Sequence, residues 1–177
     1  IDQLLNQHGI EIADLDAIAF SAGPGSFTGI RLAAAIAKSL AYAANIPVVT
    51  VSSLAAMAQA YQRESAQGGL CLVVVDAKMG EFYTGEYQFD HQALAQAIRQ
   101  DDLISNEALS VIDTQAKCLL CDNLELIEAK ENLQALDKKQ ISATAEDVVC
   151  LAEQAILLGK SESALDVQVQ YLRGKSG

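Results

Sequence analysis

Residues 23–31, GPGSFTGIR, lie between a short apolar run at residues 17–20 and a long alanine-rich segment. This placement predicts a strand-to-helix turn, where α/β folds carry their working loops. Gly23 and Gly25 permit close backbone approach, and Ser26 is a natural N-cap whose helix leaves N–H groups free to face an anion. The loop matches neither Gly-x-Gly-x-x-Gly nor the Walker pattern. Gly23, Gly25 and Ser26 are therefore weak candidates for phosphate binding, and a purely structural turn is the alternative.

The composition indicates a soluble, acidic, folded protein. Hydrophobic residues make up 51% of the 177 residues, enough for one domain or two small lobes. The net charge of −11 repels phosphate backbones, so we expect any nucleic-acid contact to run through a partner. No apolar run approaches the roughly 20 residues that cross a bilayer, and the amphipathic opening lacks a signal-peptide pattern. We expect a cytoplasmic protein with no membrane partner.

The four cysteines predict neither a metal site nor a redox pair. Cys118 and Cys121 have Cys-x-x-Cys spacing, but the run CLLC is typical of a strand, in which positions i and i+3 point to opposite faces. Cys71 and Cys150 also lie in or beside apolar runs. We expect small buried side chains in a reducing compartment, and no metal or cofactor.

The first 68 residues alternate between helix and strand. The patterns predict a helix at residues 1–8 closed by Gly9, a buried strand at 17–20, a helix at 27–45, a strand at 48–51 and a helix at 54–67. This alternation indicates an α/β fold with a mostly parallel sheet. Because two parallel strands do not form a stable sheet, it also suggests that strands precede Ile1.

A second unit begins near residue 69. The patterns predict a β-hairpin of residues 71–75 and 81–89, a helix at 92–99, a strand at 117–121, a helix to residue 158 opened by the capping box at Thr144, and a strand at 167–172. We therefore expect two lobes, residues 1–68 and 69–177. Whether the C-terminal helix packs back towards the first lobe is left open.

Four stretches resemble the bacterial TsaB family, also called YeaZ. They are GPGSFTGIR at 23–31, IPVVTVSSLAAMA at 46–58, VDAKMGEFY at 75–83 and YLR at 171–173. The resemblance covers nearly the whole chain. It implies a two-lobed fold of the actin, sugar-kinase and heat-shock ATPase type (ribonuclease-H-like), with a first lobe that lacks its N-terminal strands. The chain departs from the family at Val169-Gln170, where Pro-Val is usual.

The resemblance also implies an indirect activity. TsaB-like proteins are non-catalytic partners of a catalytic paralogue, TsaD, and act with the ATPase TsaE to add threonylcarbamoyl to a tRNA adenosine. They self-associate as homodimers when the paralogue is absent. The chain is thus expected to have no intrinsic activity, with tRNA contacted only through the complex. The alternatives are a nucleotide-dependent transferase or metallopeptidase of the same superfamily, or a nucleotide binder that uses the glycine loop.

Two positions favour the non-catalytic reading. In the paralogue the helix start that matches residues 51–57 carries two metal-binding histidines, whereas this chain has Ser53 and Met57 there.

Asp76 and Glu81 could act as paired carboxylates, but a capped hairpin with Lys78 neutralising its neighbours is the preferred interpretation.

The helix at 27–45 is predicted to be a docking surface. On a helical wheel the side expected to pack on the sheet holds Gly29, Ala33, Ile36, Leu40 and Ala44. The side expected to face a partner holds Phe27, Arg31, Ala34, Ala35, Lys38 and Tyr42. Leu4 and Leu5 of the first helix are expected beside it, which gives a four-helix seam between two similar subunits. The alternative is a helix that its Arg and Lys merely keep soluble.

Overall fold

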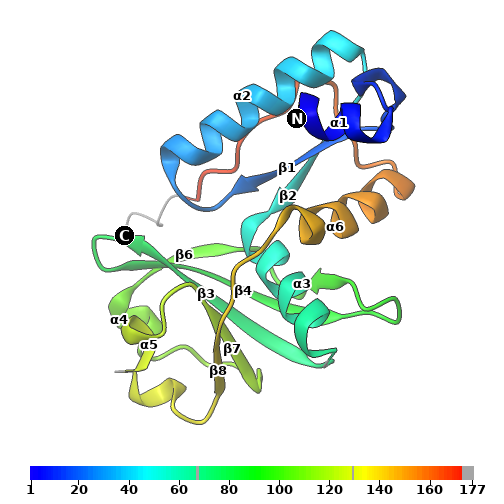
Figure 1. Cartoon of the computed structure of the whole chain (residues 1–177). Helices are drawn as coiled ribbons and strands as arrows, with labels where there is room; N and C mark the ends of the chain where they lie inside the picture. Colours follow the sequence, from blue (N-terminus) through cyan, green and yellow to red (C-terminus); the bar gives the residue numbers. More distant parts are fainter. Residues whose placement is uncertain (67, 129, 173–177) are drawn as a thin grey trace.

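The structure is a computed structural model and describes residues 1–66, 68–128 and 130–172. Two β-sheets lie one above the other in Figure 1, with helices α3 (Ser53–Ser65) and α6 (Ala145–Leu157) between them. Chain order is helix, strand, helix, strand, helix for the first 65 residues, as the alternating pattern predicts. Among the described helices, none combines the length and apolarity that a bilayer crossing requires.

The upper sheet pairs β1 (Ile18–Gly23) and β2 (Val48–Ser52) in parallel. Alternate side chains point to opposite faces, so each face has its own apolar cluster. One cluster joins Phe20 and Ala22 to helix α2 (Phe27–Ala44). The other joins Val49 and Val51 to α6. The sheet is therefore covered on both faces, as parallel pairing requires.

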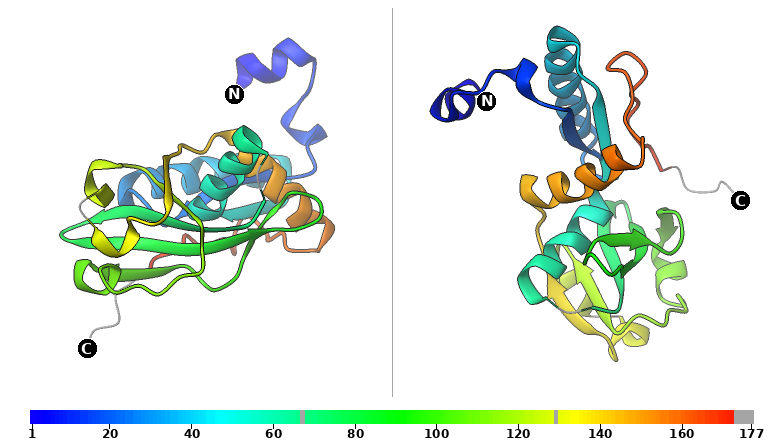
Figure 2. Two further views of the ribbon diagram at one scale, coloured as in Figure 1. Left: turned by 90° about the horizontal axis from the view of Figure 1, so that it is seen from below. Right: turned by 90° about the vertical axis from the view of Figure 1, so that its right-hand side faces the viewer.

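Helix α1 (Asp2–His8) precedes this sheet and stands away from both sheets as an arm. Gly9 ends it in the left-handed conformation at φ 65°, which confirms the predicted helix end. A 3-10 turn, η1 (Ile12–Asp14), then leads into β1. The two views of Figure 2 show the arm extending beyond the outline of the rest of the first lobe.

The lower sheet is mixed, with six strands. Its path runs β5-β4-β3-β7-β8, and β6 also pairs with β4. The strands are β3 (Leu70–Lys78), β4 (Glu81–Phe89), β5 (Ala95–Ala97), β6 (Asp102–Ser105), β7 (Cys118–Cys121) and β8 (Asp137–Gln140). Helix α3 covers one face, and the short elements α4 (Asn106–Leu109), α5 (Glu125–Glu128) and η2 (Glu131–Leu133) cover the other. The predicted hairpin, the strand at 117–121 and the capping box at Thr144 are confirmed.

Two of the predicted secondary-structure elements are wrong. Residues 92–99 form no helix, because Asp90 accepts hydrogen bonds from the backbone N–H groups of Gln92 and Leu94 and turns the chain into strand β5. Residues 167–172 form no regular strand, although the Gln170 N–H donates to the Ala22 carbonyl at 3.0 Å. Residue 173, the last of the YLR stretch, lies outside the described residues.

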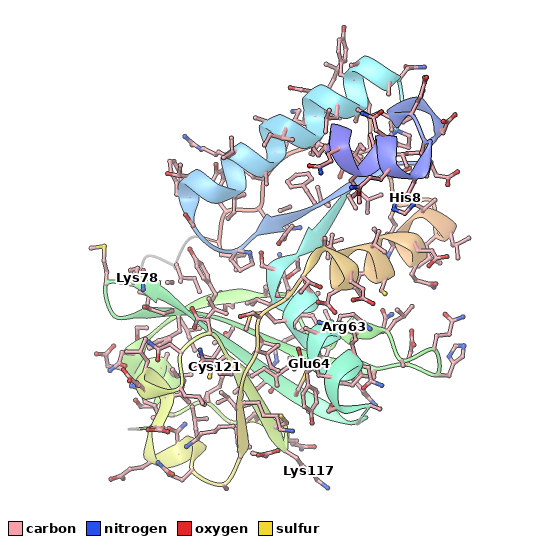
Figure 3. All side chains as sticks on the ribbon, in the orientation of Figure 1. His8, Arg63, Glu64, Lys78, Lys117 and Cys121 are labelled. Carbon is pink, nitrogen blue, oxygen red and sulfur yellow. The ribbon has the colours of Figure 1, made fainter. Side chains whose placement is uncertain are left out.

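Helices α3 and α6 are joined by a two-pronged ion pair. Arg63 Nε donates to Asp147 Oδ1 at 2.8 Å and Nη2 donates to Oδ2 at 3.2 Å, with the Asp147 side chain fully buried (Figure 3 labels Arg63). Burial alone would raise the pKa of the Asp147 carboxyl, but hydrogen bonds from Arg63 and Thr144 outweigh it and hold the pKa below its usual value. The same carboxylate caps α6 through the Thr144 N–H at 2.8 Å.

We predict that Arg63→Ala lowers the free energy of unfolding by about 3 kcal/mol, because it leaves a buried carboxylate without its cation. The measurement is urea unfolding followed by circular dichroism. Glu64→Ala is the matched control, since Glu64 is half exposed and lies 3.7 Å from the same guanidinium. Its effect should stay below about 0.5 kcal/mol. Equal losses in the two variants would contradict the assignment.

Candidate functional site: the outer face of helix α2

The glycine loop is filled by this chain's own atoms. Gly23 is buried at φ 107°, and a Cβ placed on it would lie 2.9 Å from Ile30 Cδ1 and 3.0 Å from the Gln170 carbonyl oxygen. Its close backbone approach therefore serves packing between loop, helix and C-terminal segment. Ser26 caps α2, its Oγ accepting from the Gly29 N–H at 3.4 Å, and Gly25 has only an ordinary contact with Ile30. The Gly23–Pro24 peptide bond is cis.

The side of helix α2 that is buried differs from the side that the helical wheel predicts. The residues that it buries are Ile30, Ala34, Ala37 and Ala41. Ala34 is therefore wrongly placed by the sequence: it is 8% exposed and packs with Phe20 and Val48 in the cluster beneath the helix. Of the side expected to face the sheet, Gly29 and Ile36 are wrong because they are exposed, whereas Ala33 packs against the cluster beneath the helix. Alanines let the helix backbone come close to the sheet, whereas the larger side chains of Leu32 and Ile36 turn outward.

Part of the predicted docking side is covered by the C-terminal segment. Arg31 Nε donates to the Tyr171 hydroxyl at 2.8 Å, and its guanidinium carbon lies 3.7 Å from the centre of the Phe27 ring. Lys38 Nζ donates to the Val167 carbonyl at 2.9 Å. Arg31 and Lys38 thus hold residues 167–171 along one flank of α2.

Tyr42 and Ala35 remain exposed, as the wheel predicts for both. The other exposed side of α2 is apolar and was missed by the sequence reasoning. Leu32 is 60% exposed and Ile36 45%. A groove of about 470 Å³ runs from this side to the arm, and its lining includes Leu5, Ile10 and Leu40.

In the arm itself Leu4 is 61% exposed. We call Leu4, Ile10, Leu32 and Ile36 the aliphatic face. The signal in the sequence was the spacing of Leu32, Ile36 and Leu40, with large residues every four positions in a helix otherwise rich in alanine.

Comparison with known proteins identifies the family. A profile described as TsaD, tRNA N6-adenosine threonylcarbamoyltransferase, matches residues 1–160. The tRNA threonylcarbamoyladenosine biosynthesis protein TsaB of Buchnera aphidicola (subsp. Schizaphis graminum) is 32% identical, over 84% of this chain and 72% of its own length. The chain belongs to the TsaB family. The TsaB protein of Escherichia coli K12 is 28% identical over 98% of this chain and 77% of its own length.

Solved structures of the TsaB family agree on the fold. A Pseudomonas aeruginosa protein described as similar to peptidase YeaZ superposes with a TM-score of 0.85 at 31% identity, covering 97% of this chain and 80% of its own. YeaZ from the same organism also gives 0.85, at 30% identity. The two-lobed, actin-like and ribonuclease-H-like fold that the resemblance implies is thereby confirmed.

Ser53 and Met57, the two positions that the resemblance matches to histidines of the catalytic paralogue, carry side chains with structural contacts. Ser53 Oγ lies 2.7 Å from Ser21 Oγ, a hydroxyl pair that ties α3 to β1. Met57 is 8% exposed and belongs to the apolar cluster between α3 and the lower sheet. Neither side chain is arranged to bind a metal.

The β3–β4 turn is a capped hairpin. Lys78 Nζ lies 2.6 Å from Asp76 Oδ2, and the Lys78 N–H donates to Oδ1 at 2.8 Å (Figure 3 labels Lys78 at the hairpin tip). The hydrogen bond from Lys78 holds the pKa of the Asp76 carboxyl below its usual value. This geometry supports the prediction that Lys78 neutralises its neighbour, because the Lys78 ammonium and backbone N–H each donate to one oxygen of the Asp76 carboxylate.

Cys118 and Cys121 lie where the strand pattern predicts, whereas Cys150 lies in α6 and is only half-buried. Cys118 faces the cluster under α3, and Cys121 faces the cluster on the other side of the sheet, so the Cys-x-x-Cys sulfurs point apart. Cys71 is buried beside Cys118, and burial raises the pKa of its thiol to about 12. Within the described ranges, His, Cys, Asp and Glu form no group of three or more that could hold a metal.

We predict that Gly23→Ala destabilises the protein by about 2 kcal/mol, because the new Cβ would strike Ile30 and a backbone oxygen at a φ that favours glycine. Gly29→Ala, in the first turn of α2, is the matched control. Gly29 is helical and its nearest new contact would be 3.5 Å away, so this variant should be neutral or up to about 1 kcal/mol more stable. Thermal unfolding of both variants checks the difference, and a stable Gly23→Ala protein would contradict the packing role.

Proposed function

We propose that this chain is a non-catalytic subunit in the biosynthesis of threonylcarbamoyladenosine in tRNA, and that it binds a TsaD-like catalytic paralogue through the aliphatic face. The observation that carries this proposal is the exposure of Leu32 and Ile36 beside the apolar groove on α2. The names of its relatives from Escherichia coli and Buchnera aphidicola support the pathway.

The aliphatic face has the chemistry of a protein interface. Large exposed aliphatic side chains on two neighbouring elements are typical of surfaces that another protein covers. A partner helix could lie in the groove between the arm and α2, because Ala43 and Ala44 leave room for close approach. Of the residues expected from the sequence, Leu4, Leu5 and Ala35 fit this interface. Phe27, Arg31, Lys38 and Tyr42 would border it.

A non-catalytic role is supported by what occupies the positions where a catalytic relative carries its chemistry. A hydroxyl pair and a buried thioether stand in place of the paired histidines, and Lys78 neutralises Asp76. The net charge of −11 favours tRNA contact through partner subunits. We further propose a TsaE-like ATPase as a member of the assembly, and homodimer formation through the same face when the paralogue is absent.

The division into lobes at residues 68 and 69 also stays a proposal. Helix α3 packs on the lower sheet, whereas α6 packs on β1 and β2 and thus lies back against the first lobe. A paralogue that contacts α1 and α2 would therefore reach mainly the first lobe.

We predict that Leu32→Glu with Ile36→Glu raises the Kd for the TsaD-like paralogue by about a hundredfold or more, because two charges would enter an apolar interface. Both side chains are exposed, so the fold should be kept, and circular dichroism checks this. Isothermal titration calorimetry on the two purified proteins gives the affinities.

Val111→Glu is the matched control, since Val111 is 79% exposed in the second lobe. Its Kd should stay within about twofold of wild type. Normal binding by the double variant would place the interface elsewhere.

We also predict that the purified protein contains well under one metal ion per chain and hydrolyses ATP no faster than background. Elemental analysis and a phosphate-release assay provide the two measurements. Turnover that Ser53→Ala abolishes would favour the alternative, an enzyme of the same superfamily. Turnover that persists in Ser53→Ala would point to a contaminating ATPase.

A further inference from the structure

A cavity of about 320 Å³ lies where the two lobes meet. Its walls come from both lobes and from α3 and α6, the two helices between the sheets. The lining also includes residues of β2, β4, β5 and the C-terminal segment. Ala55, Leu151 and Ala155 form its apolar wall. Thr50, Ser52, Tyr87, Gln100, Asp101 and Gln170 supply its polar groups. It is separate from the aliphatic face.

The Asp101 carboxylate is held in this cavity by two hydroxyl groups. Ser52 Oγ donates to Asp101 Oδ2 at 2.5 Å, and the Tyr87 hydroxyl donates to Oδ1. Ser52 belongs to the upper sheet and Tyr87 to the lower one, so the carboxylate links the two. Each oxygen keeps a second lone pair for another donor.

The site is built to seat a carboxylate. A Cβ on Gly85 would lie 2.5 Å from Asp101 Oδ1 and 2.7 Å from the Tyr87 ring. Glycine at this position in the middle of β4 therefore leaves the space that the Asp101 carboxylate fills. Tyr87 is 1% exposed, so its hydroxyl is fixed in place.

Among the residues that the structure describes, the negative charge of Asp101 has no partner of opposite sign. Across residues 1–66, 68–128 and 130–172, Asp101 takes part in no ion pair. Arg99 is two residues away in sequence, but its guanidinium lies 2.5 Å from Glu86 on the other side of the strand. Burial raises the pKa of the Asp101 carboxyl, although the hydrogen bonds from Ser52 and Tyr87 lower it in part. A cation that enters the cavity would relieve this cost.

We propose that this cavity binds the primary ammonium group of a small organic amine, with Asp101 as its counter-ion. An ammonium has three N–H donors, which the Asp101 carboxylate, the Thr50 hydroxyl and the amide oxygens of Gln100 or Gln170 can accept. The apolar wall at Leu151 and Ala155 would contact a short carbon chain. A divalent metal fits less well, because Asp101 is the single carboxylate in the lining.

The test uses the whole chain and a defined probe. Propylammonium and the uncharged propan-1-ol are titrated at equal ionic strength, and backbone amide shifts are followed by ¹H–¹⁵N NMR. We expect saturable shifts at Ser52, Gln100 and Asp101 with propylammonium alone. Asp101→Asn, which keeps the shape of the side chain, should weaken the apparent affinity about tenfold or more. The fold of each variant is checked by the same spectra.

Asp102→Asn is the matched control, because Asp102 is the next residue and lines a different cavity. It should leave the apparent affinity within about twofold of wild type. Shifts that do not saturate, that propan-1-ol reproduces, or that persist in Asp101→Asn would overturn the proposal. None of these results depends on the binding of a TsaD-like paralogue.

Discussion

The close packing of alanines between α2 and the upper sheet determines which side chains of α2 are exposed for binding another protein. Ala34, Ala37 and Ala41 are buried against β1 and β2, and their small side chains bring the helix backbone near the sheet. With that side fixed, Leu32 and Ile36 must point outward. The glycine loop supports the same arrangement, because Gly23 lets Ile30 and the C-terminal segment come together beneath the start of the helix.

Polar side chains join the two lobes, whereas apolar side chains cover the faces of the sheets. The Arg63–Asp147 ion pair joins the two connecting helices, and the Ser52–Asp101–Tyr87 hydrogen bonds join the two sheets. The Asp147 carboxylate is fully buried and Asp101 is half-buried, so each depends on its donors being held in place. They differ in charge balance, since Asp147 pairs with Arg63, whereas the described side chains that donate to Asp101 are the hydroxyl groups of Ser52 and Tyr87. This difference makes the junction a structural clamp at one point and a candidate binding site at the other.

Local signals in the sequence were reliable where neighbouring residues decide the structure. The αL end at Gly9, the cap at Ser26, the capping box at Thr144 and the opposed Cys118 and Cys121 all depend on residues within a few positions. The helix predicted at residues 92–99 does not form, because Asp90 accepts hydrogen bonds from two backbone N–H groups. The chain that follows pairs with the edge of β4 instead. The strand predicted at residues 167–172 does not form, because among the described residues this segment makes a single backbone hydrogen bond to β1 and is otherwise held by Arg31 and Lys38 of α2.

The sequence by itself determined the order of helices and strands, the acidic surface, the family resemblance and the absence of paired histidines at residues 53 and 57. These depend on composition, short-range pattern and residue identity. Only the tertiary structure decided which side of α2 faces outward, because a helix that is apolar nearly all round has no polar side to orient it. It also decided that Asp101, Ser52 and Tyr87 meet, since they are brought together from three separate segments of the chain.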